Sequence, residues 1–234
     1  MGIIDKNFHP SPVDIEAGQT ILLDKPLRWT SFQAVKKVKY LTHAKKIGHA
    51  GTLDPLATGL LILCTGKATK MIETIQNAPK EYIGEIVLGK TTPSYDLETA
   101  FNAEFPTNHI SKELIHETAK TFQGEVWQSP PLFSAIKIDG KRGYELARKG
   151  IEKEVMPRKI LIEFFEITNI LMPSVFFRLR CSKGTYVRSL AHDFGKALHS
   201  GAYLASLRRT KIGDFLVENA LTIDELTTIF RYNK

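Results

Sequence analysis

A stretch that isolates one carboxylate among small and apolar residues constrains this chain more than any other feature. Residues 48–61 read GHAGTLDPLATGLL, and Asp54 is the only acidic residue between Lys25 and Lys70. A carboxylate taken out of water is costly unless a cation meets it. The three glycines permit tight turns, and Pro55 restricts the backbone just after the acid. We therefore predict a shaped loop that presents the Asp54 carboxylate, with an Asp that only caps a turn as the alternative.

The chain carries its positive charge in two blocks. Its formal net charge is +7, which is a modest excess by itself. Residues 25–53 hold seven Lys and Arg and no acid, and residues 178–211 hold eight against the single acid Asp193. Backbone phosphates are the natural counter-charge for such blocks, and binding to them weakens as salt rises. The distribution therefore indicates a polyanionic partner.

Length and composition predict a folded cytoplasmic protein. A chain of 234 residues, 43% of them hydrophobic, can bury a sizeable core as one domain or two closely packed halves. It has no run of about eighteen apolar residues, and its first twenty residues lack the apolar centre of a signal peptide. Cys64 and Cys181 lie far apart without a CxxC motif or a nearby His cluster. We expect two buried apolar thiols rather than a disulfide or a zinc site.

The first half of the chain is predicted to begin with an arm, residues 1–18, which is polar and contains two prolines. The predicted strands of this half cover residues 20–23, 60–64 and 82–88. Thr30 or Ser31 can cap a helix between the first two strands. The predicted apolar face of that helix is Phe32, Val35, Val38 and Leu41. The third strand is expected to alternate around Ile83 and Val87.

Two long polar loops, residues 89–110 and 129–150, are predicted in the second half. Strands are expected at 160–171 and 175–181, joined by a hairpin at Met172 and Pro173. Helices are marked by Leu114, Ile115, Ala119 and Phe122, and by Leu190, Ala191, Phe194, Ala197 and Leu198. Thr222 and Glu225 form a capping box for a last helix to Phe230. Strands and helices mix without a regular βαβ rhythm, which favours an α+β fold.

Two motifs resemble those of the TruB family of tRNA pseudouridine synthases. The loop around Asp54 is similar to the family's G-x-L-D-P-x-A-x-G, whose Asp is the nucleophile, so the resemblance implies that role for Asp54. The segment CSKGTYVRSLAHDFG is similar to C-S-K-G-T-Y-x-R, whose Arg is the partner of the nucleophile. This implies that Arg188 holds Asp54 ionised through its guanidinium fork, and that Tyr186 contacts the substrate. A phosphate-binding or surface Arg is the alternative for Arg188.

Three more residues correspond to family site residues. Tyr82, in KEYIGEIVLG, resembles the active-site Tyr, which can stack on an extruded uracil and offer its hydroxyl for proton transfer. His49 matches the His that helps to hold the RNA loop open. Leu207, in LRRTKIGDF, matches the wall of the uracil pocket. A core Tyr and a structural hydrogen-bonding His are the alternatives for the first two.

Two further blocks extend the resemblance to the RNA-binding surface. DKPLRWTS resembles K-P-x-G-x-[ST]-S, with Lys25 and Pro26 matching and Arg28 standing where the family has Gly. Residues 130–150 resemble the mobile, thumb-like loop that clamps the T arm. Its basic residues suited to phosphate contacts are Lys137, Lys141, Arg142 and Arg148. Lys25 is likewise expected to bind substrate.

The resemblance implies a fold, an activity and a partner for this chain. The fold would be a mixed, largely antiparallel central sheet flanked by helices and RNA-clamping loops, with residues 19–234 as one catalytic domain and no C-terminal PUA-type domain. The activity would be isomerisation of uridine 55 in the tRNA T loop, by base flipping, cleavage of the glycosidic bond and reattachment through C5. No cofactor, metal or membrane is expected, and the tRNA T stem-loop is the partner of a monomeric enzyme.

Two other functions remain open at this point. One is a non-catalytic RNA-binding or RNA-folding module with the same fold, and the other is a pseudouridine synthase that acts on a different RNA, such as ribosomal RNA. The chemical steps are also open, because a carboxylate can attack C1′ or C6 or assist departure of the uracil. Asp54 serves in each of these routes.

Overall fold

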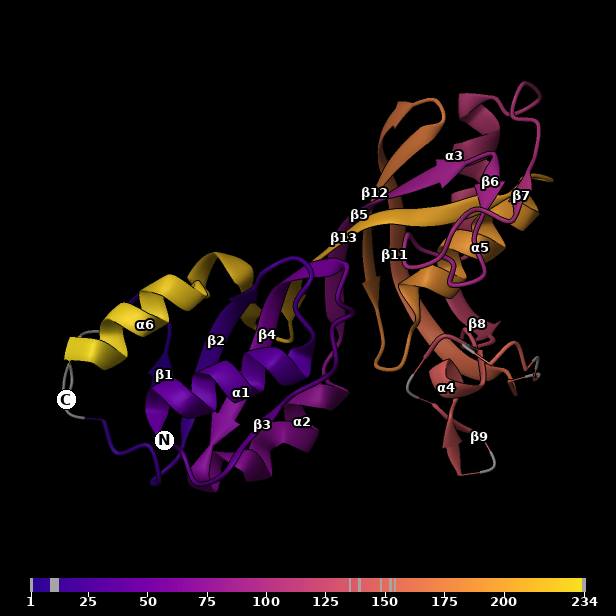
Figure 1. Ribbon diagram of the computed structural model, residues 1–234. Coiled ribbons are helices and arrows are strands. Elements are labelled where there is room, and N and C mark those ends of the chain that lie inside the picture. The colour runs from indigo at the N-terminus through magenta and orange to yellow at the C-terminus, as the bar shows by residue number, and fades with distance from the viewer. Residues whose placement is uncertain are drawn as a thin grey trace. The chain divides into compact units, whose positions relative to one another are not determined.

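The computed structural model describes residues 2–8, 13–134, 136–138, 140–147, 149–151, 153 and 155–232 (Figure 1). The chain forms two compact units, the first made of residues 1–82 and 207–234 and the second of residues 83–206. Strands β5 (Lys80–Leu88) and β13 (Ala202–Ile212) have residues in both. None of the helices in the described ranges is long and apolar enough to cross a membrane.

The first unit contains a mixed sheet with strand order β1, β2, β4, β13. Its strands are β1 (Gly2–Ile4), β2 (Gln19–Lys25), β3 (Ile47–His49), β4 (Ala57–Thr65), the end of β13, and β14 (Phe215–Leu216). The pairs β1 with β2 and β4 with β13 are parallel, whereas β2 and β3 are antiparallel to β4. The predicted strands at 20–23 and 60–64 are confirmed, while β1 falls within the residues expected to form an arm.

Strand alternation divides the core of the first unit into two layers. Helices α1 (Ser31–Thr42) and α6 (Ile223–Tyr232) pack on one face of the sheet. The buried residues of that layer include Ile21, Leu23, Ala34, Val38, Leu61, Leu63, Leu226 and Phe230. The 3-10 helix η1 (Gly66–Met71) and α2 (Ile72–Asn77) lie against the other face. That layer includes Leu22, Leu60, Ile62, Cys64, Ala68 and Ile75. Successive residues of β2 and β4 thus fill opposite layers, as the two-residue period of a strand requires.

Both predicted helix caps of the first unit are present. Thr30 Oγ1 accepts a hydrogen bond from Gln33 N at 3.0 Å at the start of α1. At the start of α6, Glu225 accepts from Thr222 N at 2.7 Å, and Thr222 Oγ1 accepts from Glu225 N at 3.2 Å. These reciprocal bonds satisfy amide groups that the first helical turn leaves without partners.

The predicted apolar face of α1 is wrong at its first member. Phe32 is 73% exposed, and the buried residues of the helix are Ser31, Ala34, Val38 and Thr42. The hydroxyl of Ser31 is bonded to the backbone of Leu53, so this residue turns inward and its neighbour turns to solvent. A small residue at position 34 then lets the helix approach the sheet closely.

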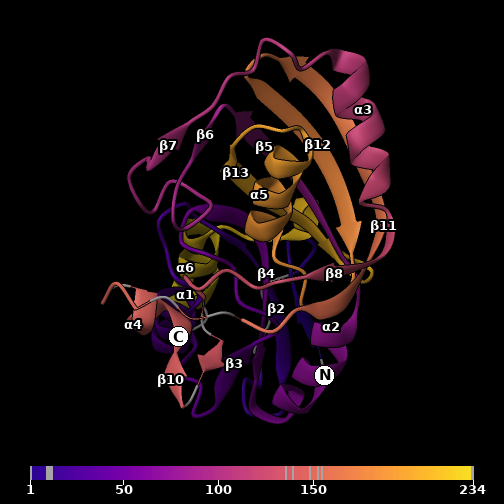
Figure 2. The same ribbon diagram turned by 90° about the vertical axis from the view of Figure 1, so that its right-hand side faces the viewer.

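The second unit is built on strands β5, β12, β11 and β8, in that order. Its further strands are β8 (Gly124–Gln128), β11 (Arg158–Leu171) and β12 (Ser174–Cys181). Strand β11 is antiparallel to both β8 and β12. The predicted hairpin at 172–173 is therefore confirmed, whereas β8 was not anticipated. Helices α3 (Lys112–Thr121) and α5 (Val187–Ala197) lie on one side of these strands (Figure 2). Between them and the sheet, Phe122, Phe165, Phe177 and Phe194 pack edge to face.

The prediction of which residues of β5 face the core is wrong. Ile83 is 44% exposed, while Ile86 and Leu88 are buried, so the inward positions are the even-numbered ones. Gly84 shares that inward face, and a Cβ there would lie only 2.6 Å from Ser206 O and 2.7 Å from the Phe177 ring. Close packing at the glycine therefore sets which side of the strand faces the core.

The two predicted loops contain small elements. The first includes the paired strands β6 (Lys90–Thr91) and β7 (Ala103–Glu104). The second includes the paired strands β9 (Lys137–Ile138) and β10 (Lys141–Arg142), followed by α4 (Gly143–Ala147). Cys64 and Cys181 are both buried, as predicted, and they are not joined in a disulfide. Parallel and antiparallel pairs with flanking helices confirm the mixed α+β fold.

Candidate active site

The loop that carries Asp54 is held on both sides of that residue by bonds within the first unit. Ser31 Oγ accepts from Leu53 N at 2.9 Å and donates to Leu53 O at 3.1 Å. Arg28 N donates to Pro55 O at 2.7 Å. Asp54 itself is half-buried. Because its two neighbours are anchored through backbone atoms, the backbone that carries the Asp54 side chain is held in place by the protein itself.

The buried guanidinium of Arg209 supports the same loop through backbone carbonyls. Arg209 is 2% exposed, and its Nε donates to Leu60 O at 2.7 Å. Its two terminal nitrogens donate to Thr52 O at 3.3 Å and Gly51 O at 3.2 Å. A Cβ at Gly59, which has φ of 101°, would lie 2.3 Å from Arg209 O. From the sequence, Arg209 is predicted only as part of a basic block, and its place in the LRR segment beside Leu207 is the one local signal of this role.

Arg28 has a backbone conformation that explains why the family has Gly at this position. Its φ is 66°, in the left-handed region, which costs an L-residue roughly 1–2 kcal/mol. We expect Arg28→Gly to raise the free energy of unfolding by about 0.5–1 kcal/mol, after allowing for the greater freedom of Gly in the unfolded chain. Urea unfolding of the purified protein measures this difference.

The matched control is Arg28→Ala, which removes the same charge but keeps a Cβ. If the Ala variant gained as much stability as the Gly variant, the gain would come from the charge and not from the backbone.

Lys25 lies fully buried beside the Asp54 loop. Its Nζ donates to Pro26 O at 2.9 Å and to Trp29 O at 2.6 Å. Burial lowers the pKa of Lys25 from 10.5 to about 8, the negative charge of Asp54 opposes this shift, and the positive charge of Arg209 adds to it. Lys25 thus fixes the turn that precedes α1 and interacts electrostatically with Asp54.

The lowered pKa of Lys25 predicts a pH-dependent contribution to stability. Between pH 8 and 10.5 the unfolded chain binds more protons at this group than the folded chain does, so the free energy of unfolding rises with pH. We expect wild type to gain stability relative to Lys25→Met when the pH is raised from about 7.5 to about 9.5. Urea unfolding of both proteins at the two pH values measures the gain, and a pH-independent difference would contradict it.

His49 presents a neutral imidazole next to the loop. Burial lowers its pKa, with the charge of Arg209 acting in the same direction. Its Nδ1 is buried and has no hydrogen-bond partner among the described residues. Gln76 Nε2 donates to the carbonyl of His49 at 3.4 Å, which holds the backbone rather than the ring. The ring is therefore held neutral close to the backbone of the Asp54 loop, where a hydrogen bond with the Gly51 backbone opposes the lowering of its pKa.

Tyr82 and Leu207 are the other predicted site residues of the first unit. Tyr82 lies on β5 and is 8% exposed. Leu207 is partly buried and pairs in register with Ala57, three residues after Asp54. The next residue, Arg208, holds both carboxylate oxygens of Asp24, at 3.0 and 2.6 Å. The register of β13 against β4 thus places Leu207 close to the end of the Asp54 loop.

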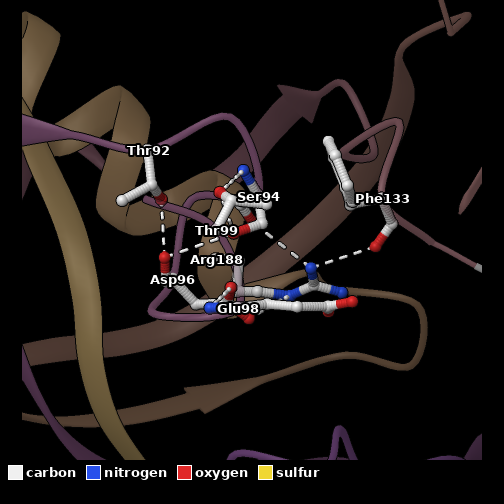
Figure 3. Close-up of polar contacts among 7 residues, drawn as sticks. All are labelled: Thr92, Ser94, Asp96, Glu98, Thr99, Phe133 and Arg188. Carbon is white, nitrogen blue, oxygen red and sulfur yellow. Dashed lines mark hydrogen bonds and ion pairs between the residues drawn. The ribbon is translucent and has the colours of Figure 1, made fainter. Parts of the chain in front are cut away.

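Arg188 lies in the second unit and is held from several directions (Figure 3). It is 4% exposed and is the second residue of α5, which follows a turn at Gly184 with φ of 84°. One terminal nitrogen donates to Ser94 O at 3.2 Å and to Phe133 O at 3.0 Å. Its Nε lies 3.6 Å from Oδ2 of Asp96, which is 5% exposed. These partners fix the plane of the guanidinium, as its rigid fork permits.

The loop around Asp96 is itself stabilised by internal bonds. Thr92 Oγ1 donates to Asp96 O at 2.6 Å, and Asp96 Oδ1 accepts from Glu98 N at 2.9 Å. The hydroxyls of Ser94 and Thr99 are 2.9 Å apart. The sequence predicts only a polar loop in this segment and does not indicate that Asp96 contacts Arg188. A single acid in such a loop carries no local signal of a partner 92 residues further along the chain.

The remaining predicted site residues are Tyr186 and the basic residues of the 130–150 loop. Tyr186 N donates to Gln128 Oε1 at 2.7 Å, and the Arg158 guanidinium lies 4.7 Å from the centre of its ring. Lys137 and Arg142 are register partners in β9 and β10. Arg148 lies outside the described residues. Among the residues that are described, no group of three or more His, Cys, Asp or Glu could hold a metal ion.

Comparison with known sequences defines the class and then the family. A sequence model of the TruB family pseudouridylate synthases, N-terminal domain, matches residues 39–187. A model of the tRNA pseudouridylate synthase B C-terminal domain matches residues 188–234. The first match spans more than half of the chain and contains Asp54. This chain belongs to the TruB family.

Individual relatives agree with this assignment. The tRNA pseudouridine synthase B of Flavobacterium johnsoniae is 59% identical over 91% of this chain and 96% of its own length. The corresponding protein of Phocaeicola vulgatus is 49% identical over 91% of this chain and 93% of its own length. A solved Cbf5-Nop10-Gar1 complex contains a chain with TM-score 0.72 and 32% identity over 92% of this chain. Only 54% of that longer chain is covered.

Proposed function

We propose that this protein converts uridine to pseudouridine at position 55 in the T loop of tRNA. Members of its family carry out this isomerisation, and relatives named tRNA pseudouridine synthase B cover nearly its whole length. The observation that carries the proposal is the Asp54 carboxylate, half-buried on a loop whose backbone is anchored by Ser31, Arg28 and Arg209. Such preorganisation suits a group that must meet a reacting atom in one orientation.

The reaction requires only rearrangement of covalent bonds. The bond between N1 of uracil and C1′ of ribose breaks, the base turns, and a bond forms between C5 and C1′ while the C5 proton is lost and N1 gains one. Asp54 acts as the nucleophile at C1′ or C6, or assists departure of uracil by stabilising the sugar left behind. We assign Arg188 as the cationic partner of Asp54, and Tyr82 as the residue that stacks on the flipped base.

The remaining site residues are proposed to bind RNA. Leu207 forms the wall of the uracil pocket, and His49, beside the Asp54 loop, helps to hold the RNA loop open while the target base leaves its stack. The other assigned contacts are Tyr186, Lys137, Arg142 and Arg148. Lys25, expected from the sequence to bind substrate, is instead fully buried and donates to two backbone carbonyls, so it supports the turn before α1. We propose that the protein acts as a monomer in the cytoplasm on the T stem-loop of tRNA.

The deciding experiment incubates purified protein with an unmodified tRNA transcript and maps pseudouridine by chemical labelling. Pseudouridine at position 55 alone supports the proposal. Modification of ribosomal RNA but not of the tRNA T loop would assign a different substrate. Binding of tRNA without modification of either RNA would favour a non-catalytic RNA-binding module.

Helix α1 presents a surface suited to part of that RNA. It contains no acidic residue, and its exposed side chains include Phe32, Lys36, Lys39 and Tyr40. Phe32 and Tyr40 are 73% and 74% exposed. Exposed rings can stack on bases, and lysines neutralise phosphates.

We expect the double variant Lys36→Gln, Lys39→Gln to weaken tRNA binding and to lower the slope of log affinity against log salt by about one unit per lysine. Filter binding or fluorescence anisotropy over a salt series measures the slope. Lys120→Gln, on α3 among Glu113 and Glu117, is the matched control and is expected to leave the slope unchanged. Equal slopes for wild type and the double variant would exclude α1 from the RNA interface.

A further inference from the structure

An aromatic pair lies beside the contacts of Arg188 in the second unit. The rings of Tyr95 and His192 are stacked, with centroids 4.0 Å apart and planes 13° apart. His192 follows Arg188 by four residues on α5, so the two side chains leave the same side of the helix. Tyr95 lies between Ser94 and Asp96, the two loop residues that contact the guanidinium. The stack therefore joins the loop that holds Arg188 to the helix that carries it.

The backbone of Tyr95 is in a conformation that an aromatic residue adopts only at a cost. Its φ is 64°, in the left-handed region that favours Gly or Asn. Tyr95 N donates to Thr92 O at 3.1 Å, and Tyr95 O accepts from Leu204 N at 2.9 Å. With this turn, Ser94 O and the Asp96 carboxylate both reach Arg188. A Gly would form the same turn with less strain, but it has no ring to stack on His192.

His192 supplies the complementary surface as an uncharged ring. Burial lowers its pKa to about 4, and the positive charge of Lys196 acts in the same direction. Its Nδ1 is buried and has no hydrogen-bond partner in the described part of the chain. The contact with Tyr95 is therefore made by the face of the ring and does not depend on that nitrogen.

We propose that His192 and Tyr95 are positioning residues for Arg188. Their stack keeps the Ser94 carbonyl and the Asp96 carboxylate against α5, and so fixes the plane in which the guanidinium is presented. This inference rests on the proposed function, in which Arg188 is the cationic partner of Asp54. Small misplacement of a catalytic group is sufficient to slow an enzyme, since an error of about 1 Å can cost about 100-fold.

The test compares His192→Ala with His192→Phe in single-turnover reactions on a tRNA transcript. We expect His192→Ala to lower the rate of the chemical step about tenfold without changing the Kd for tRNA, and His192→Phe to restore it to within about twofold. In the Arg188→Lys background, His192→Ala is expected to cost less than about twofold, because the group it positions is gone. His116→Ala, an exposed His on α3, is the control and keeps the wild-type rate.

Three results would overturn the inference. They are an unchanged rate for His192→Ala, an equal loss in both backgrounds, or a folded His192→Phe variant as slow as the Ala variant. A readout independent of catalysis is the Nε–H resonance of Arg188 in ¹⁵N-arginine-labelled protein. It is expected to be sharp in wild type and His192→Phe and broadened in His192→Ala. If wild type makes no pseudouridine but the resonances behave in this way, the proposed function fails and the positioning role stands.

Discussion

Asp54→Asn is expected to abolish pseudouridine formation while the fold and tRNA binding are retained. Asn has nearly the same shape but lacks the charge that every route for the reaction needs, so we expect turnover to fall by at least about 1,000-fold. The loop is not expected to move, because it is anchored through Leu53, Pro55 and the backbone carbonyls that Arg209 binds.

Mapping of pseudouridine in a tRNA transcript, together with thermal unfolding and a binding titration, checks the three parts of this expectation. Asp214→Asn, an exposed Asp in the turn between β13 and β14, is the matched control with wild-type activity. Appreciable residual turnover would remove Asp54 from the nucleophile role. The variant has one further expected property: without the negative charge of Asp54, the pKa of Lys25 falls further below its usual value.

Arg188→Lys is expected to be the second most damaging change, with a loss of about 100-fold or more in the rate of the chemical step. One terminal nitrogen of the Arg188 guanidinium donates to Ser94 O and Phe133 O, and its Nε lies near the Asp96 carboxylate. One ammonium cannot reproduce that fork. Single-turnover kinetics measure the loss, and thermal unfolding shows whether the fold is retained. A near-normal rate would argue that the fork is not needed in the reaction.

Asp96→Asn tests the same arrangement from the other side. It keeps the shape of the Asp96 side chain but removes the negative charge that lies 3.6 Å from Nε of the buried Arg188 guanidinium. If Asp96 acts through Arg188, the double variant is no slower than Arg188→Lys alone. Additive losses would show that Asp96 has a separate role.

Much of the local structure could be predicted because it depends on neighbouring residues. The caps at Thr30 and at Thr222 with Glu225 are present, and so is the hairpin at 172–173. Two inward positions were assigned wrongly, Phe32 at the start of the apolar face of α1 and Ile83 in β5. In both segments apolar residues occur on both sides, so the period is visible in the sequence but its phase is not. The bond from Ser31 to Leu53 sets the phase in α1, and the close packing at Gly84 sets it in β5.

The sequence by itself determined the family, the α+β fold and the loop that carries Asp54. These depend on residue order, on short-range turn chemistry and on periodicity, all of which are local. Only the tertiary structure showed that Arg209 supports that loop, that Asp96 contacts Arg188 and that Tyr95 stacks on His192. The reason is that Arg209 is 149 residues from Leu60, and Arg188 is 94 residues from Ser94. A charge in the sequence indicates that a partner is needed, but only the folded chain decides which partner lies within reach.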